Sequence, residues 1–555
     1  MSGSASAGEA SARPLCLLLL AASGVALATR LYAARVVGFG DSESLYASYA
    51  LFPAPAYVDH PGLIGLIARD IGHGSAPTTL AAHTVTAVAA TLAPWWMVAC
   101  ARMLGASARS ALLAGLLTLA APEVAVGLFG MTPDLPLFFA WVMALGCFGR
   151  ALTRAPGSLD AALLFTASGV ALGVGCAAKV SGLTLALACL LSLSTPRGRE
   201  HARTAGPWTT LFLAACIFAP VVAHEQHTGW PMVHHRLVDT QHDAGLSIRN
   251  AFAIVMGQAA YVSPLLFVGG LVAGRQLYRS RREDSVTSLL AAAVFVPVGV
   301  LGALCLWSRV AEPHWLAPAW LALPLYLSLR RNASAIPTTL RFRAFGTWAI
   351  GTGVAISVAI HAWVLMPGWV SLVPLRFYDA RLDIANELYG WPEVRKDVMT
   401  LVAETRGPED APGDVVVAGG VWMECAQLRA ALPADVVVSC VGEDTADFAG
   451  WAPQRRWSKS ARVVIFVHDN RAPKDSAALF PDRARLASVT RPILRGSKVA
   501  RLFTLEVLPR LSVATRGPAL QVDATAGAMG DRPASRMSAM SSASSGFGVV
   551  SSRSP

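Results

Sequence analysis

Long apolar runs separated by short polar connections fill the first two thirds of the chain. A helical run needs about 20 residues to cross roughly 30 Å of hydrocarbon, and Gly and Pro within it are normal in membranes. Eleven runs of about this length lie near 15–32, 79–101, 110–128, 134–152, 160–178, 180–195, 208–224, 251–274, 286–307, 313–329 and 344–366. The pattern predicts an α-helical polytopic membrane protein with about 11 transmembrane helices over residues 15–366.

The pattern changes after residue 366, where the composition becomes that of an ordinary soluble protein. A helix is expected over 421–432, between short apolar runs that are typical of buried strands. These runs lie at 414–417, 435–438 and 462–467. Residues 367–510 are therefore predicted to form a small α/β domain. The flanking segments 1–14 and 511–555 are small and polar, or rich in Ser, Ala and Gly, and are expected to be disordered.

Composition supports an integral membrane protein, because 54% of residues are apolar and only 15% are charged, against about 25% in a soluble protein. The first run is interpreted as an uncleaved signal anchor, since many spans follow it. We find no RNA-binding or zinc-finger spacing and expect no nucleic-acid partner, no metal and no cofactor. Cys425 and Cys440 lie in the polar part of the chain, and either a disulfide or two buried thiols would suit them.

Arginine residues gather in alternate loops, which accounts for the net charge of +11. They are Arg102, Arg109, Arg150, Arg154, Arg197, Arg199, Arg203, Arg275, Arg279, Arg281, Arg282, Arg330, Arg331, Arg341 and Arg343. The positive-inside rule places these loops in the cytoplasm together with the N-terminus. The large first loop, 34–78, the loop 224–250 and the α/β domain are then predicted to lie on the opposite, extracytoplasmic face.

The first loop concentrates polar side chains beside a span. Asp41, Glu43, Asp59 and His60 occur within about twenty residues, among aromatic residues and prolines. Carboxylates beside a membrane span are costly unless they face water, a partner or a substrate. Asp41 or Glu43 could act as a general base in a shielded cleft. The alternative is a helix N-cap or a solvated charge. The segment 62–71 is amphipathic and could lie along the membrane interface.

Two further candidates fall at the same face. Asp134 opens a span in MTPDLPLFF, where it is either a reactive carboxylate or a helix cap beside Pro133. Lys179 lies between two apolar runs. Its ammonium would either bind a phosphate or reach along its own stem to the interface.

Another turn and a histidine-rich loop complete the polar groups of this face. Arg309 could hold a phosphate or pair with Glu312, and His314 follows in the same turn. The loop 224–243 holds five histidines, but their spacing matches no recognised set of metal ligands. A metal site there is the less favoured alternative.

The order of four short motifs resembles that of the bacterial GT-C membrane glycosyltransferases. The first-loop signature of that superfamily is similar to DSESLYASYA…YVDHPGLIGL, and its second-loop stretch to MTPDLPLFFAW. AAKVSGLTL and EPHWLAPAWLAL are similar to its later segments, and NELYGWPEV also looks like bacterial members. The resemblance covers roughly residues 15–400 and includes the protein O-mannosyltransferases and the aminoarabinose lipid A transferases of glycosyltransferase family 39.

This resemblance implies the GT-C fold, a polyprenyl-phosphate-sugar donor and a lipid or glycan acceptor. The catalytic candidates that it implies are Asp41, Glu43 and Asp134. The substrate-binding candidates are Asp59, His60, Lys179, Arg309 and His314. The adjacent Asp-Glu of the family is split here by Ser42, so either carboxylate could be its counterpart.

We therefore expect an enzyme that transfers a sugar to an acceptor hydroxyl with inversion, in cell-envelope or lipopolysaccharide modification. It would lie in the bacterial inner membrane, with its active site facing the periplasm. Alternatives are a transporter or lipid-binding scaffold, a protein O-glycosyltransferase for secreted proteins, and a degenerate accessory subunit. Transporters usually carry internal repeats and charges near the midplane. The sequence shows no convincing repeat, and its charges cluster at one face.

Overall fold

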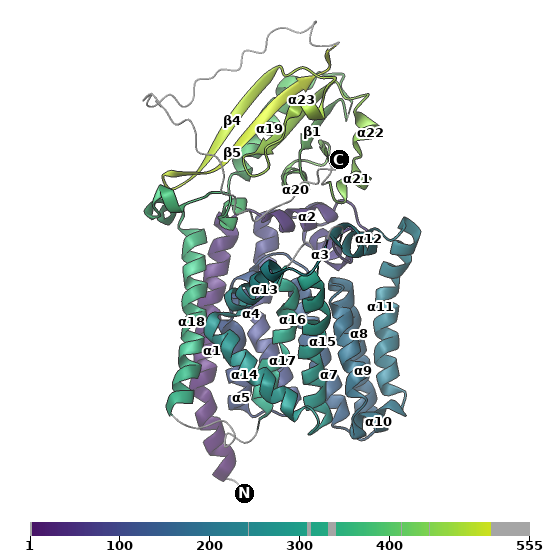
Figure 1. The fold of residues 1–555 in the computed structure, drawn as a ribbon, viewed down its shortest axis with the longest axis vertical. Helices are drawn as coiled ribbons and strands as arrows, with labels where there is room; N and C mark the ends of the chain where they lie inside the picture. Colours follow the sequence, from purple (N-terminus) through teal and green to yellow (C-terminus); the bar gives the residue numbers. More distant parts are fainter. Residues whose placement is uncertain are drawn as a thin grey trace.

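The computed structural model describes residues 3–241, 244–307, 312–330, 340–411, 413–442 and 445–511. Figure 1 shows a bundle of roughly parallel helices with an α/β layer covering one end, while the N-terminus lies at the other end. Apart from Leu511, the tail predicted to be disordered, 511–555, lies outside the described residues. The site is built where the bundle meets the α/β layer.

Seven helices of the described chain are long and apolar enough to cross a membrane. They lie within α1 (Gly3–Val36), α4 (Thr79–Met103), α7 (Asp134–Leu152), α8 (Leu159–Ala178), α11 (Gly206–Thr228), α15 (Ser285–Trp307) and α18 (Leu340–Leu365). Arg102 and Arg150 lie in the last turns of α4 and α7, at the end away from the α/β layer (Figure 1). The charge pattern of the loops thus agrees with the arrangement of the helices.

Two predicted runs are bent rather than continuous, which corrects the prediction of simple spans at 110–128 and 251–274. The first is α5 (Ala108–Ala120) followed by α6 (Pro122–Ala125) and η1 (Gly127–Phe129), with a bend of 76°. The second is α13 (Ile248–Val262) followed by α14 (Pro264–Ser280), with a bend of 105°. Each break falls at a proline, which cannot donate the helical hydrogen bond. Ser263 adds a positive φ of 84° at the second break.

The remaining two predicted runs are helical but short. Residues 180–195 contain α9 (Gly182–Ser192), whose 11 residues extend roughly 17 Å at about 1.5 Å per residue. Residues 313–329 form η3 (Pro313–Leu316), α16 (Ala317–Trp320) and α17 (Ala322–Leu329). All eleven predicted runs are therefore helical.

Shorter helices occupy the connections. They are α2 (Asp41–Tyr49), α3 (Leu63–Ile71), α10 (Pro196–Ala202), α12 (Pro231–Leu237) and η2 (Asp239–Gln241). Helix α3 is amphipathic, as predicted for 62–71, because Ile64 and Ala68 are buried while Arg69 and Asp70 are exposed. Helices α2, α3 and α12 lie between the bundle and the α/β layer (Figure 1).

The α/β layer has a five-stranded sheet in the order β2-β1-β3-β5-β4. Strands β1 (Val415–Gly419), β2 (Val437–Cys440) and β3 (Val463–Asp469) are parallel. The predicted strands and helix are present, the helix as α20 (Trp422–Ala431). The antiparallel pair β4 (Ala487–Arg495) and β5 (Lys498–Pro509) was not predicted. The sequence gives no sign of β4 because most of its side chains are exposed, so it contains no apolar run.

Further short elements complete the layer. They are η4 (Pro367–Leu372), η5 (Leu375–Phe377), η6 (Ile384–Leu388), α19 (Trp391–Thr405), α21 (Phe448–Trp451), α22 (Gln454–Trp457) and α23 (Ser476–Leu479). Of the two alternatives open for Cys425 and Cys440, the structure has the disulfide, which joins α20 to the end of β2.

One hydrophobic core runs from the first loop into the α/β layer. Phe39, Leu45 and Tyr49 of the first loop belong to the same buried cluster as Trp391 of α19 and Leu428 of α20. Burying apolar surface stabilises by roughly 25 cal/mol per Å². The layer is therefore docked on the bundle by a common core, and its side chains can reach the first loop at fixed positions.

Candidate active site

Glu43 is turned back toward the start of its own helix. Its Oε2 accepts a hydrogen bond from the backbone N–H of Gly40 at 2.9 Å, and its Oε1 accepts one from Met131 at 2.7 Å. Nε2 of His83 lies 2.9 Å from the same Oε1. Burial alone would raise the pKa of Glu43, but His83 and the two backbone N–H groups outweigh it and lower the pKa. Glu43 thus ties the first loop to the segment just before Asp134.

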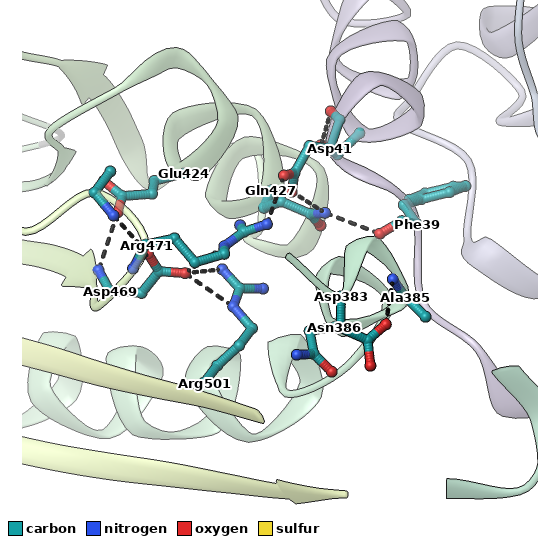
Figure 2. Close-up of polar contacts among 12 residues, drawn as sticks. Phe39, Asp41, Asp383, Ala385, Asn386, Glu424, Gln427, Asp469, Arg471 and Arg501 are labelled. Atoms are coloured by element: carbon teal, nitrogen blue, oxygen red, sulfur yellow. Dashed lines mark hydrogen bonds and ion pairs between the residues drawn. The ribbon is translucent and has the colours of Figure 1, made fainter. Parts of the chain in front are cut away.

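Asp41 points the other way, toward the α/β layer. Its Oδ1 accepts a hydrogen bond from Nε2 of Gln427 at 3.2 Å, and its Oδ2 accepts one from Nη1 of Arg471 at 3.1 Å (Figure 2). Residues two apart on a helix are separated by about 200° around its axis. The two carboxylates of Asp41-Ser42-Glu43 consequently face different partners, a distinction that the sequence pattern left open.

Asp134 and Lys179 form an ion pair at the same end of the bundle. Nζ of Lys179 donates to Oδ1 of Asp134 at 2.7 Å. Asp134 is the first residue of α7, and Lys179 occupies the extended break between α8 and α9. The break brings the buried ammonium to the first turn of the neighbouring helix. Lys179 therefore has an internal anionic partner.

Asp59 and His60 lie beside a second group of cations. Oδ1 of Asp59 accepts a hydrogen bond from Nη2 of Arg236 at 3.0 Å. His60 is buried, and its ring centroid lies 5.6 Å from that of Tyr46. Burial, and then the charges of Lys179, Arg236 and His314, lower the pKa of His60. Four of the predicted site residues, Asp59, His60, Lys179 and His314, thus gather around one position.

The last predicted turn is described only in part. Arg309 lies outside the described residues, so its predicted roles stay predictions. Nδ1 of His314 lies 3.2 Å from Oε2 of Glu312, which gives Glu312 a cationic neighbour when the imidazole is protonated.

The described part of the histidine-rich loop contacts the first loop. Nε2 of His235 lies 3.6 Å from Asp59, and Glu225 accepts a hydrogen bond from the backbone of Met232 at 3.0 Å. Among the residues that the structure describes, no group of three or more His, Cys, Asp or Glu side chains is placed to hold a metal ion.

An apolar cavity of about 640 Å³ opens beside Asp134. Glu123 and Asp134 line it at the end near the α/β layer, and Arg109 lines it at the opposite end. Between them the walls are mostly apolar, from Leu113, Leu117, Leu137, Phe138, Leu266 and Ile350. From Arg109 to Ala121 the lining of α5 extends roughly 18 Å at about 1.5 Å per residue. The bent helix pairs, which the sequence predicts as simple spans, form much of this wall.

Several residues at the site were not identified from the sequence, His83 beside Glu43 among them. Gln427 and Arg471 contact Asp41 from the α/β layer, more than 380 residues away in the chain. Glu387 approaches Gly40 so closely that a Cβ there would lie 2.9 Å from its Oε1. Burial, and then the charge of Asp41, raises the pKa of Glu387 to about 8. The sole signal for any of them was the segment NELYGWPEV, which contains Glu387.

Comparisons with known proteins agree with this architecture. Residues 71–224 match the family model described as dolichyl-phosphate-mannose-protein mannosyltransferase. No curated protein matches the sequence. The crystal structure of ArnT from Cupriavidus metallidurans bound to undecaprenyl phosphate is similar, with 16% identity and a TM-score of 0.55 over 88% of this chain and 97% of that chain. Its apo state gives 17% identity and the same TM-score, over 89% and 98%.

A more partial likeness links the chain to a yeast enzyme. The S. cerevisiae protein O-mannosyltransferase Pmt1-Pmt2 complex bound to the sugar donor is 18% identical, over 39% of this chain and 33% of that chain, with a TM-score of 0.30. The ArnT structures carry the comparison of folds. The GT-C membrane fold predicted from the sequence is confirmed, and the family match supports the predicted glycosyltransferase class.

Proposed function

We propose that this GT-C protein is a membrane glycosyltransferase that moves a sugar from a polyprenyl-phosphate donor to an acceptor hydroxyl. The observation that carries the proposal is that Asp134, which pairs with the buried Lys179, lines the apolar cavity. A polyprenyl-phosphate sugar has an apolar chain joined to an anion. The site offers an apolar channel that ends beside a buried ammonium.

The donor lipid would occupy the cavity. Its walls are mostly apolar, and its charged lining residues, Arg109, Glu123 and Asp134, lie at its two ends. The ArnT of C. metallidurans was crystallised with undecaprenyl phosphate, and we assign a donor of that class to this chain. The transporter alternative is not favoured, because the polar groups gather at one face.

The phosphate of the donor would bind among the cations of this face. Lys179 and Arg236 each already hold a carboxylate at hydrogen-bonding distance, so their side chains are oriented before a substrate arrives. Charge-assisted hydrogen bonds from such groups to phosphate are about twice as strong as neutral ones. Asp134 would orient Lys179, and His60 and His314 lie within range of the same charges.

We assign Asp41 as the general base. The acceptor oxygen would attack the anomeric carbon as its proton passes to Asp41, and the bond from that carbon to the phosphate oxygen would break. The electron pair of this bond leaves with the lipid phosphate, whose charge Lys179 stabilises. A single displacement of this kind inverts the anomeric centre. Glu43 is less suited, because three groups already contact its oxygens, those of Gly40, Met131 and His83, whereas Asp41 has two such partners and keeps more lone pairs for the acceptor hydroxyl.

We place the reaction at the periplasmic face of a bacterial inner membrane. Helix α10, which carries Arg197 and Arg199, lies at the end of the bundle away from the α/β layer (Figure 1), and the positive-inside rule assigns that end to the cytoplasm. A lipopolysaccharide-type glycolipid or a polysaccharide is the proposed acceptor. A hydroxyl of a secreted protein is the second candidate, because the matching family model describes protein mannosyltransferases.

The test is a transfer assay with the purified full chain, radiolabelled polyprenyl-phosphate sugars, and either envelope glycolipid or secreted protein as acceptor. We expect label in one acceptor class, and loss of transfer in Asp41→Asn, Asp134→Asn and Lys179→Ala. Asp160→Asn is the matched control, because Asp160 is exposed in the first turn of α8. No transfer from any such donor, or full activity in all three site variants, overturns the proposal.

A further inference from the structure

We infer that the α/β layer completes the active site by holding Asp41 with Arg471 and Gln427 as positioning residues, an inference that rests on the proposed function. The geometry is a clamp on one carboxylate. Gln427 donates to one oxygen and Arg471 to the other, at 3.2 and 3.1 Å. Only 6% of the Asp41 side chain is exposed, so its orientation is set by these partners.

Gln427 fixes the carboxylate relative to the backbone of the first loop. Its Nε2 donates to the carbonyl oxygen of Phe39 at 2.8 Å as well as to Asp41 (Figure 2). It is carried by α20, whose Cys425 is joined by the disulfide to the end of β2. The amide therefore reaches Asp41 from a helix that is itself anchored to the sheet.

Arg471 is oriented before it meets Asp41. Its Nε donates to Oδ2 of Asp469 at 3.0 Å, while its Nη1 is directed to Asp41. Asp469 is fully buried at the end of β3 and is held in turn by Nε of Arg501 at 2.9 Å. The guanidinium of Arg501 packs against Trp391, 4.6 Å from its ring centroid. This chain of ion pairs leads from the sheet to the proposed base (Figure 2).

Docking alone does not account for the clamp, because other contacts hold the layer in place. The common hydrophobic core is one. Another is Asp447, which accepts hydrogen bonds from the hydroxyl of Tyr49 at 3.1 Å and the backbone N–H of Val58 at 2.9 Å. A buried ion pair costs desolvation energy and adds little net stability. A guanidinium placed beside the proposed base is better explained by a role in holding that base.

The carboxylates around Asp41 also favour a cation at this position. Glu43 and Glu387 lie close enough for their charges, and that of Asp41, to influence one another. Neighbouring carboxylates repel one another. A displacement of the base by about 1 Å can lower the reaction rate by about 100-fold. Arg471 supplies the opposing charge and a fixed direction. Sugar transfer would therefore require the α/β layer in its docked position.

The test compares Arg471→Ala, Arg471→Lys and Gln427→Ala in the full chain, with the donor and acceptor of the transfer assay. We expect Arg471→Ala to lower kcat by about 10–100-fold, while the KM for donor changes little because the lipid cavity is elsewhere. Arg471→Lys should recover part of the loss, since it keeps the charge but not the fork of donors. Added guanidinium should partly restore Arg471→Ala. Gln427→Ala should lose kcat by a smaller factor.

Arg491→Ala is the matched control, because Arg491 forms an exposed pair with Asp397 on the same layer, at 2.6 Å. Its kcat should equal that of the wild type. Wild-type kcat in Arg471→Ala, beside an inactive Asp41→Asn, overturns this inference and leaves the proposed function standing. The inference is also overturned if neither guanidinium nor Arg471→Lys restores kcat and the loss of kcat follows the fall in the midpoint of thermal unfolding. That result would mean that Arg471 only docks the layer. A wild-type chain inactive with every donor overturns both.

Discussion

The two sides of the active site are built in different ways. On the bundle side, Glu43 accepts a hydrogen bond from the segment just before α7. Asp134 of α7 pairs with Lys179 at the break between α8 and α9. On the side of the α/β layer, Arg471 and Gln427 reach Asp41 from a sheet and helix that follow the bundle in sequence. In the proposed function, the bundle side would provide the lipid cavity and the cations for phosphate. The layer orients the proposed base, so the two sides would fail differently when mutated.

The largest expected effect is the loss of the proposed base itself. Asp41→Asn removes the proton acceptor, and its amide can accept from only one of Gln427 and Arg471, which both donate to the carboxylate. Removing one well-placed electrostatic group typically costs about 10²–10³ in kcat. We expect that loss of kcat with only a modest fall in the midpoint of thermal unfolding, measured by the transfer assay and by a thermal shift in detergent. A fall in stability equal to that of a core variant would instead make Asp41 a docking residue.

The sequence predicts the bundle side of the site better than the side of the α/β layer. The apolar runs, the charge of the loops and the motifs around Asp41, Asp134 and Lys179 predicted the fold, the topology and most of the bundle side. Each of these signals is local, because a span or a motif shows itself within about 20 residues. Arg471 is an ordinary arginine in a polar loop, and only the docking of the sheet brings it to Asp41.

The bends of the cavity wall show the same limit. Prolines at 122 and 264 were visible, but prolines at 94 and 297 lie within continuous helices. Whether a proline bends a membrane helix depends on what satisfies the freed backbone groups, which neighbouring helices decide. The cavity beside Asp134 was consequently outside the reach of sequence patterns, although the lipid donor was expected from the resemblance.

The disulfide should carry the next largest effect, and it falls on the side of the layer. Replacing Cys425 and Cys440 together by alanine frees a loop whose ends are 15 residues apart. Closing such a loop is worth about 3 kcal/mol in the chain-entropy model. We expect the free energy of unfolding of the layer to fall by about that amount, as followed by tryptophan fluorescence in denaturant. Because α20 carries Gln427, kcat should fall too, whereas binding of polyprenyl phosphate should not.

Glu43→Gln should lower kcat less than Asp41→Asn does and should act mainly on stability. A neutral amide cannot accept the hydrogen bonds of Gly40, Met131 and His83 at both of its ends, so one buried donor loses its partner. Leaving such a group unsatisfied costs about 1–3 kcal/mol. We expect a lower midpoint of thermal unfolding, with more activity per folded molecule than Asp41→Asn retains. Equal loss of kcat at full stability would transfer the role of base to Glu43.

The smallest expected effect concerns Asp447, which docks the layer on the first loop. Burial, with the charge of Asp59, raises the pKa of Asp447 to about 7, above the usual value of 3.8. A carboxyl whose pKa is raised on folding stabilises the folded state fully below its unfolded pKa, and loses that contribution as the pH rises toward 7. Docking should therefore weaken between about pH 4 and pH 7.

Asp447→Asn tests this dependence directly, because an amide can accept from Val58, donate to the hydroxyl of Tyr49 and carry no charge at any pH. The midpoint of thermal unfolding of the wild type should be lower at pH 8 than at pH 5, and the variant should lose most of that difference. An equal pH dependence in both proteins would show that another carboxyl governs it. Glu387, which lies near Asp41 and has a pKa of about 8, would then be the next group to replace.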